Sequence, residues 1–402
     1  MKVLVADKFE KVGIDGLQEL GCRVRVEPGV TAADLPALLR EYDPKILIVR
    51  SKKVTAEALE AGSGLSLVIR AGAGTDTIDV AAASHLGVFV SNCPGRNSIA
   101  VAELVMGLLL SVNRRIPDQV RDLRAGIWNK AEYGRARGLH GRTLGIVGLG
   151  QIGREIAKRA QAFGMQVCAW SRQLTIEEAT RSAIGYCETP IDVARLSDAV
   201  SINVAGTPET KHLVNAEFLA ALKPGATLIN TSRGSVVDEA AVADAVRERG
   251  LRVGLDVYAE EPAGGTGTFA NPLIDLPVVY GTHHVGASTE QAQVAIAHEV
   301  IRIVTEFRAT GGVPNCINRL AKSSATHVLS IRHENRPGVL AHVFQVLAEE
   351  AINVEEVENI LYHGAQATCA RIHVSALPPE SALARIAADN GHIISADVKP
   401  IG

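Results

Sequence analysis

Thr143-Leu-Gly-Ile-Val-Gly-Leu-Gly-Gln-Ile-Gly153 lies near the middle of the chain, where an apolar run opens into a glycine-rich turn. A helical pattern over 154–163 follows directly. This order of strand, turn and helix is typical of dinucleotide-binding sites. Gly148 permits the tight turn, Gly150 lets the backbone approach a pyrophosphate, and Gly153 lets the helix lie close to the strand. The free N–H groups at the helix N-terminus would then hold the pyrophosphate.

Composition favours a metabolic enzyme over other classes. The 402 residues are 47% hydrophobic and 4% aromatic, and the formal net charge is −3 without a long basic run, which argues against a nucleic-acid partner. The longest apolar run, 99–112, contains Glu103 and is too short to span a membrane. The six cysteines form no C-x-x-C pair, which fits reduced thiols. We expect a cytoplasmic protein without a signal peptide, a membrane partner or a catalytic metal.

Alternating strand and helix patterns predict two doubly wound, parallel-sheet (Rossmann-like) α/β domains. Long helices are expected from Ile99 to about Arg114 and from Ser288 to about Arg308, the second with Ser288 and Gln291 at capping-box spacing. We expect residues 1–98 and 288–316 to form one domain and residues 99–287 the other. The candidate strands of the two domains are 3–6, 24–27, 46–49, 67–71 and 88–91, then 143–148, 166–170, 199–204, 226–231, 252–257 and 278–282.

The C-terminal part reads as a separate small domain. Residues 317–325 belong to a Gly-, Pro-, Asn- and Ser-containing stretch that predicts a linker. Over 326–402 the pattern is strand, helix, two strands, helix and strand, with the segments 328–331, 340–350, 353–361, 368–374, 381–389 and 393–398. This βαββαβ order predicts a ferredoxin-like fold.

Three polar segments follow strands of the second domain. Arg233 follows one strand, Glu261 the next and His284 the last. Because ligands of open α/β sheets bind beyond the carboxyl ends of strands, these side chains are expected in one site. An arginine can hold a carboxylate, and a histidine oriented by a carboxylate can take a hydroxyl proton. The arrangement favours a dehydrogenase.

These segments and the glycine turn resemble the D-isomer-specific 2-hydroxyacid dehydrogenases over residues 1 to about 316. The stretches NTSRG (230–234) and HHVGAST (283–289) are distinctive. The resemblance implies Arg233 as the catalytic arginine, Glu261 rather than Glu260 as the carboxylate, and His284 rather than His283 as the acid–base. The family commonly has proline where this chain has His283.

The same resemblance implies a nicotinamide nucleotide as cofactor. NAD-preferring members carry an acidic residue at the end of the second strand, where this chain has Ser171 followed by Arg172. Without that carboxylate, Arg172 can pair with a 2′-phosphate, so we expect an NAD(P) enzyme that accepts NADP. The alternative is relaxed selectivity. The expected cofactor-binding residues are Gly148, Gly150, Gln151, Ile152, Gly153, Ser171, Arg172, Thr207, Thr231, Ser232 and Asp256.

Upstream loops resemble those of the family's D-3-phosphoglycerate dehydrogenases. They are the stretches 49–53, 70–79 and 92–98. The resemblance implies that 3-phosphoglycerate is the substrate, that basic side chains meet its anionic groups, and that the amides of 71–74 hold its carboxylate. The expected substrate-binding residues are Arg50, Ser51, Lys52, Arg70, Ala71, Gly72, Ala73, Gly74 and Asn97.

The C-terminal unit resembles an ACT domain, a sensor of small molecules that usually pairs with a copy from another subunit. The stretch His333-Glu-Asn335-Arg-Pro-Gly-Val-Leu340 matches the first loop of the serine-binding ACT domain of phosphoglycerate dehydrogenases, and Asn353 matches the asparagine contributed across the pair. The resemblance implies L-serine as effector, a place in serine biosynthesis, and a homo-oligomer, dimer or tetramer.

Two alternatives stay open at this point. Ser171-Arg172 also suits an NADPH-dependent hydroxypyruvate or glyoxylate reductase that carries a sensor domain. The fold further resembles nucleotide-sensing corepressor proteins, which bind partners instead of depending on turnover.

Overall fold

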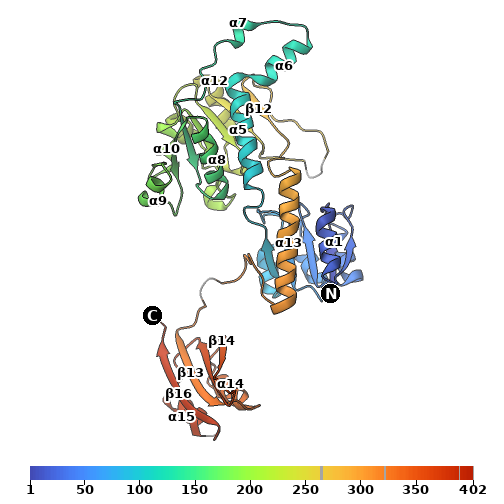
Figure 1. Ribbon diagram of the computed structural model, residues 1–402, viewed down its shortest axis with the longest axis vertical. Helices are drawn as coiled ribbons and strands as arrows, with labels where there is room; N and C mark the ends of the chain where they lie inside the picture. The colour runs from blue at the N-terminus through green and yellow to red at the C-terminus, as the bar shows by residue number, and fades with distance from the viewer. Residues whose placement is uncertain (263–265, 321–322, 389, 402) are drawn as a thin grey trace. The chain divides into compact units, whose positions relative to one another are not determined.

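The computed structural model describes residues 1–262, 266–320, 323–388 and 390–401 (Figure 1). The chain divides into two compact units, residues 1–318 and 319–402. Residues 321 and 322 of the expected linker, residue 389 of the expected last helix and residue 402 lie outside the described residues. Ile317 and Asn318, also expected in the linker, hydrogen-bond to Val90 and so extend the first unit.

The N-terminal sheet has five parallel strands in the order β2-β1-β3-β4-β5. All four residues of β3 are buried, as expected for a strand of a parallel sheet that is covered on both faces. The strands are β1 Lys2–Val5, β2 Arg23–Val26, β3 Ile46–Val49, β4 Leu67–Arg70 and β5 Phe89–Asn92, and the helices between them are α1 Lys11–Glu19, α2 Leu35–Tyr42, α3 Ala56–Ala61 and α4 Val80–His85.

The second sheet of this unit has seven parallel strands in the order β12-β11-β10-β9-β6-β7-β8. Its order reverses between β6 and β9, which is where ligands of doubly wound sheets bind. The strands are β6 Thr143–Val147, β7 Gln166–Trp170, β8 Gly185–Tyr186, β9 Ala199–Ile202, β10 Thr227–Asn230, β11 Arg252–Leu255 and β12 Val279–Gly281. Five helices connect them: α8 Gln151–Ala162, α9 Ile176–Arg181, α10 Pro190–Leu196, α11 Ala216–Ala221 and α12 Glu239–Arg249.

Two long helices join the sheets. α5 (Ser98–Arg114) buries Val105 and Leu109 in a cluster with Ile146 of the second sheet. α13 (Glu290–Thr310) buries Ile296 and Val300 in a cluster with residues of the N-terminal sheet. Short helices α6 (Ile116–Arg124) and α7 (Lys130–Tyr133) lie beyond the end of α5, at the top of Figure 1.

The expected cap of α13 at Ser288 is wrong. The helix begins at Glu290, and the Thr289 hydroxyl accepts the Ala292 N–H at 3.2 Å. Ser288 is instead part of the preceding turn, because its N–H donates to the Val285 carbonyl at 2.8 Å.

The second unit contains a four-stranded antiparallel sheet in the order β14-β15-β13-β16. Its elements follow one another as β13 His327–Glu334, α14 Val339–Glu349, β14 Val354–Leu361, β15 Ala367–Val374, α15 Glu380–Ala388 and β16 Ile393–Pro400. The predicted ferredoxin-like order is confirmed, and so is the α/β class with two parallel sheets. Within the described residues, no helix combines the length and the apolar character needed to cross a membrane.

Glu299 of α13 links this helix to the segment before α5 and to the segment that follows α13. Its carboxylate is almost fully buried and accepts from Arg302 at 2.6 Å, Arg96 at 2.6 Å and Asn315 at 2.8 Å. The Arg302 hydrogen bonds contribute most to lowering the pKa of Glu299 to about 2.

We expect Glu299→Gln to lower the free energy of unfolding by about 2 kcal/mol at pH 7, because hydrogen bonds to a buried charge are lost. The folded-state pKa lies below that of the unfolded chain, so this contribution is complete above about pH 4.5 and declines as the pH falls toward 2. Urea unfolding at pH 7 and pH 3 measures both effects. Equal stability of the variant and the parent chain at pH 7 would contradict the role of Glu299.

Candidate active site

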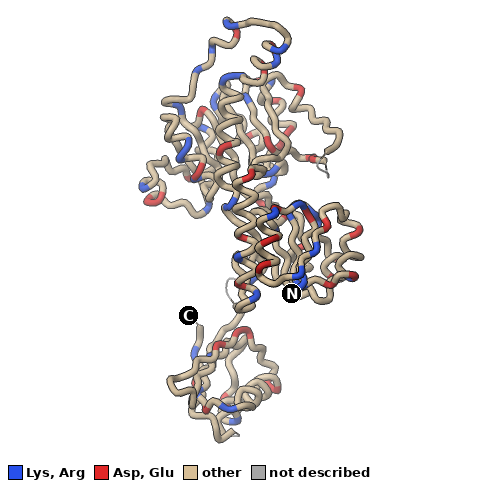
Figure 2. The backbone as a smooth tube through the Cα atoms, turned by 45° about the vertical axis from the view of Figure 1, so that its right-hand side comes forward, with Lys and Arg blue, Asp and Glu red and all other residues tan. Residues whose placement is uncertain are grey.

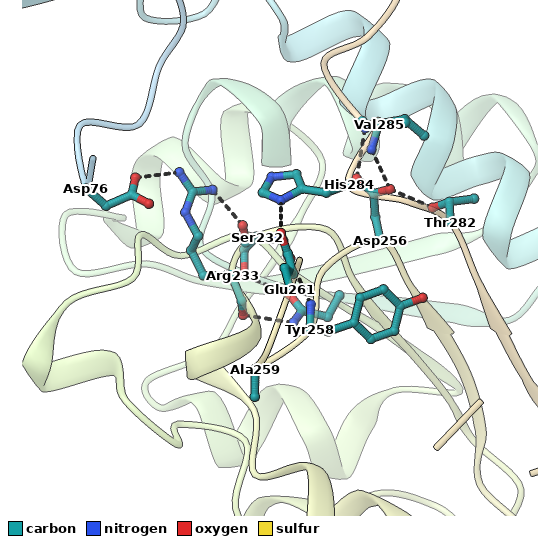
Figure 3. Close-up of polar contacts among 12 residues, drawn as sticks. Asp76, Ser232, Arg233, Asp256, Tyr258, Ala259, Glu261, Thr282, His284 and Val285 are labelled. Carbon is teal, nitrogen blue, oxygen red and sulfur yellow. Dashed lines mark hydrogen bonds and ion pairs between the residues drawn. The ribbon is translucent and has the colours of Figure 1, made fainter. Parts of the chain in front are cut away.

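The structure brings Arg233, Glu261 and His284 together beyond the carboxyl ends of β10, β11 and β12 (Figure 3). His284 Nδ1 lies 2.7 Å from Glu261 Oε2. With Nδ1 as the donor to this carboxylate, the other ring nitrogen, Nε2, is left to exchange a proton with a ligand. His283 is exposed and has no hydrogen-bond partner among the described residues. The geometry therefore distinguishes the two neighbouring histidines.

Glu261 is held as an anion. Its Oε1 accepts the Tyr258 N–H at 3.0 Å. Burial raises the pKa of Glu261, but the His284 and Tyr258 hydrogen bonds and the nearby Arg233 charge outweigh burial and leave the pKa below its usual value. A carboxylate that stays charged stabilises the positive charge that His284 gains when it takes a proton.

His284 has a left-handed backbone, with φ of 52°. Such a conformation is uncommon for residues other than glycine and persists where its surroundings enforce it. Asp256, 1% exposed, enforces it: its carboxylate accepts from the N–H groups of Val285 and Gly286, each at 2.8 Å, and from the Thr282 hydroxyl at 2.6 Å. The role of Asp256 in cofactor binding stays a prediction, and the hydrogen bonds show that its carboxylate also holds the loop that carries His284.

Arg233, which follows β10 of the second sheet, reaches the loop after β4 of the N-terminal sheet. It donates to Asp76 Oδ1 at 2.9 Å and to the Ser232 carbonyl at 2.7 Å. A Cβ on Gly74 would overlap the Arg233 guanidinium in its present position, so a side chain there would displace the arginine. Burial raises the pKa of Asp76, but the Arg233 hydrogen bond and charge, a backbone hydrogen bond and the Arg70 charge together outweigh burial, so the pKa is lowered. Asp76 was missed from sequence, although it lies in the stretch 70–79 that resembles a substrate loop.

Arg70 lies near the same arginine. Burial lowers the pKa of Arg70, and the charges of Arg233 and Arg50 lower it further. Arg70 Nε is buried and has no hydrogen-bond partner within the described part of the chain. A Cβ on Gly72 would overlap the Arg70 guanidinium. Three arginines thus converge with Asp76 among them, an arrangement that attracts an anion.

Asp7 shapes the loop after β3. Its Oδ2 accepts the N–H groups of Arg50 at 2.7 Å, Ser51 at 3.0 Å and Lys52 at 2.9 Å. Arg50 Nη2 lies 3.4 Å from the Ser288 hydroxyl, whereas Lys52 Nζ donates to the Val30 carbonyl. Asp7 was missed from sequence, although a polar residue directly after a buried strand was a usable signal.

The loop 71–74 offers fewer amides than expected. The N–H groups of Ala71 and Gly72 donate to the carbonyls of Val49 and Arg70, at 2.7 and 2.8 Å. Those of Ala73 and Gly74 have no intramolecular acceptor among the residues described. The prediction that all four amides hold a carboxylate is therefore wrong for Ala71 and Gly72, because local turns already use them.

The glycine turn fits a dinucleotide. Gly148 has φ of 98°, and a Cβ on Gly153 would overlap the Gly148 carbonyl. A Cβ on Gly150 would meet no atom within 4 Å, so the N-terminus of α8, where Gln151 and Ile152 stand, is open. Thr231 Oγ1 and Asn97 Oδ1 are buried without a hydrogen-bond partner among the described residues. Because buried polar atoms usually have a partner, these two atoms fit contacts with a ligand.

The remaining cofactor candidates lie around this turn. Ser171 is partly buried after β7, and Arg172 is exposed. Hydrogen bonds from Thr207 and the backbone lower the pKa of Glu209 most, and the nearby Arg172 charge lowers it further. Thr207 precedes the 3₁₀ turn Pro208–Thr210, and the Ser232 hydroxyl donates to Asn230 Oδ1 at 2.7 Å.

The second unit brings together only two of its three candidates. His333 is buried, its Nδ1 lies 2.7 Å from the Glu334 carbonyl, and its Nε2 has no partner among the described residues. Asn335 Nδ2 donates to the Ala365 carbonyl at 2.9 Å. Asn353 precedes β14 at the other end of the sheet, about 20 Å away by strand length.

Two family profiles and several known proteins match parts of this chain. A profile described as D-isomer specific 2-hydroxyacid dehydrogenase, NAD binding domain, matches residues 106–286, and an ACT domain profile matches residues 327–358. The D-3-phosphoglycerate dehydrogenase of Methanocaldococcus jannaschii is 37% identical over 323 residues, 79% of this chain. The chain spans 60% of the length of that curated relative.

Solved structures are similar to this chain over a comparable share of its length. A protein of Thermus thermophilus is 32% identical with a TM-score of 0.71, and the match covers 79% of this chain and 100% of that one. An NADPH-dependent glyoxylate/hydroxypyruvate reductase of Sinorhizobium meliloti, solved with NADP and malonate, is 30% identical with a TM-score of 0.68, covering 79% of this chain and 96% of the reductase. This chain belongs to the family of D-isomer specific 2-hydroxyacid dehydrogenases.

Proposed function

We propose that this chain is an NAD(P)-linked dehydrogenase that oxidises D-3-phosphoglycerate to 3-phosphohydroxypyruvate, a step toward L-serine. The observation that carries the proposal is the His284–Glu261 hydrogen bond of 2.7 Å beside Arg233, at the strand ends that also carry the glycine turn. The 37% identity to a D-3-phosphoglycerate dehydrogenase supports the choice of substrate.

Each residue has a distinct task in this reaction. Arg233 binds the substrate carboxylate and polarises the oxygen on C2. His284 Nε2 accepts the C2 hydroxyl proton while the hydride leaves C2, and Glu261 stabilises the imidazolium that forms. A bound nicotinamide nucleotide supplies the hydride acceptor. In the reverse direction His284 returns the proton to the C2 oxygen.

The phosphate of the substrate is assigned to Arg50 and Arg70. Arg50 Nη2 reaches Ser288, which follows the histidine loop, and Arg70 is close enough to Arg233 for mutual repulsion. A dianionic phosphate held by Arg50 and Arg70 would offset the positive charge that Arg50, Arg70 and Arg233 bring together, because the guanidinium groups of Arg50 and Arg70 could both donate to it.

A hydroxypyruvate or glyoxylate reductase is the second candidate. Ser171 and Arg172 provide no carboxylate against a 2′-phosphate, and the 30% identical reductase was solved with NADP. Such an enzyme would use the same three catalytic residues but would not need Arg50 for a phosphate.

The ACT unit is proposed to bind L-serine between two copies. The buried His333 imidazole with its unpartnered Nε2 supports a polar ligand at this end of the sheet. Because Asn353 lies at the opposite end, a second copy would have to supply it, which makes a homo-oligomer part of this proposal.

His284→Ala is expected to lower kcat by about 10²- to 10⁴-fold, because a general base contributes that much to a proton transfer. NADPH affinity should change little, since the substitution leaves the glycine turn intact. Steady-state rates of 3-phosphohydroxypyruvate reduction and a fluorescence titration with NADPH measure the two effects. His283→Ala is the matched control, and a comparable loss of kcat in that variant would contradict the assignment.

Arg172→Gln is expected to lower kcat/KM for NADPH at least tenfold relative to NADH, about 1.4 kcal/mol, because a partner of the 2′-phosphate is lost. Parallel assays with both nucleotides measure the ratio. Arg195→Gln, an exposed arginine on α10, is the control of equal charge. An unchanged ratio would show that Arg172 does not read the 2′-phosphate.

A further inference from the structure

A small pocket lies where α5, α7 and β11 meet, away from the candidate active site. It has a volume of about 210 Å³ and is lined by Asn113, Arg114, Arg115, Glu132, Tyr133, Arg135, Ala136 and Arg252. That volume is below the several hundred Å³ typical of drug-sized ligands, so the pocket suits a compact molecule.

The pocket carries uncompensated positive charge. Arg115 is neutralised, because it pairs with Asp118 at 2.9 Å and with Glu132 at 2.6 Å. Arg114, Arg135 and Arg252 have no carboxylate within salt-bridge distance among the residues that the structure describes. Three arginines without a counter-ion from the described chain therefore line one pocket.

Neighbouring groups add to this charge. Arg142 is near enough to Arg252, which lines the pocket, for the two charges to interact. Burial lowers the pKa of Arg142 and the Asp198 charge raises it, while the charges of Arg137 and Arg252 lower it further. Arg142 Nε is buried without a hydrogen-bond partner within the described residues. Figure 2 shows Lys and Arg positions in blue along the extended segment at this end of the unit.

The pocket is distinct from the active site. Arg252 is the first residue of β11, whereas Asp256 and Glu261 follow its last residue. Arg142 likewise precedes β6, and Gly148 follows it. Strands of four or five residues separate the two edges of the sheet by about 15 Å. None of the catalytic or cofactor-binding candidates lines this pocket.

We propose that this pocket is a second anion site, for a small phosphorylated molecule with at least two negative charges. Guanidinium groups match phosphate oxygens in paired hydrogen bonds, and three of them without counter-ions favour a multivalent anion over a single carboxylate. The Glu132–Arg115 pair limits the site on one side and orients Arg115.

Pyrophosphate is the probe. Calorimetric titration of the full chain, saturated with NADPH so that the glycine turn is filled, should show binding that Arg252→Gln and Arg135→Gln each weaken at least tenfold. Arg124→Gln, an exposed arginine at the end of α6 that does not line the pocket, should bind pyrophosphate like the parent chain. Unchanged NADPH-dependent activity and thermal unfolding of all variants establish that they are folded.

Identical pyrophosphate binding by the parent chain, the two pocket variants and the control would overturn the proposal. An alternative is that acidic side chains of a second copy of the chain bind these arginines at an interface. Sedimentation velocity of the same samples tests this alternative, because it measures the oligomeric state. If Arg252→Gln changes the sedimentation coefficient and pyrophosphate does not bind the parent chain, the arginines serve an interface and the proposal is also overturned.

Discussion

The hydrogen bonds from the loop 282–286 to the buried Asp256 carboxylate are the interaction on which the site depends. They hold His284 at a φ of 52°, a conformation that costs about 1–3 kcal/mol when it is not enforced. A buried carboxylate without partners would itself be unfavourable, so the loop and Asp256 stabilise each other. The outcome is a histidine whose Nδ1 lies on Glu261, with the ring held in place before a substrate binds.

A second constraint is the balance of charge around Arg233. Asp76 holds this arginine at 2.9 Å, while Arg70 and Arg50 add positive charge nearby. Gly72 and Gly74 leave room for these guanidinium groups, because side chains there would displace Arg70 and Arg233 from their present positions. The same loop therefore brings cations together and leaves two amides, those of Ala73 and Gly74, for an anion. A substrate carboxylate that binds Arg233 would have to replace Asp76 as the partner of this arginine.

Much of the fold could be predicted from sequence, because apolar runs and helical spacing report burial directly. The glycine turn, both parallel sheets and the ferredoxin-like order followed from such patterns. Position within a turn is harder: Ser288 and Thr289 are both good caps, and only the Val285–Ser288 turn decides between them. Asp7, Asp76 and the loop role of Asp256 depend on contacts between segments distant in sequence, which spacing does not report. His284 was favoured over His283 by resemblance, and its backbone conformation could not be read from the pattern.

One comparison tests most directly the claim that Arg50, Arg70 and Arg233 select a phosphorylated hydroxy acid. The measurement is kcat/KM for 3-phosphohydroxypyruvate against hydroxypyruvate, with NADPH, in the parent chain and in Arg50→Gln, each with and without L-serine. The account predicts a strong preference for the phosphorylated substrate that falls at least tenfold in the variant, and turnover that responds to serine. Equal use of both substrates, unchanged in Arg50→Gln and indifferent to serine, would contradict it and favour the reductase.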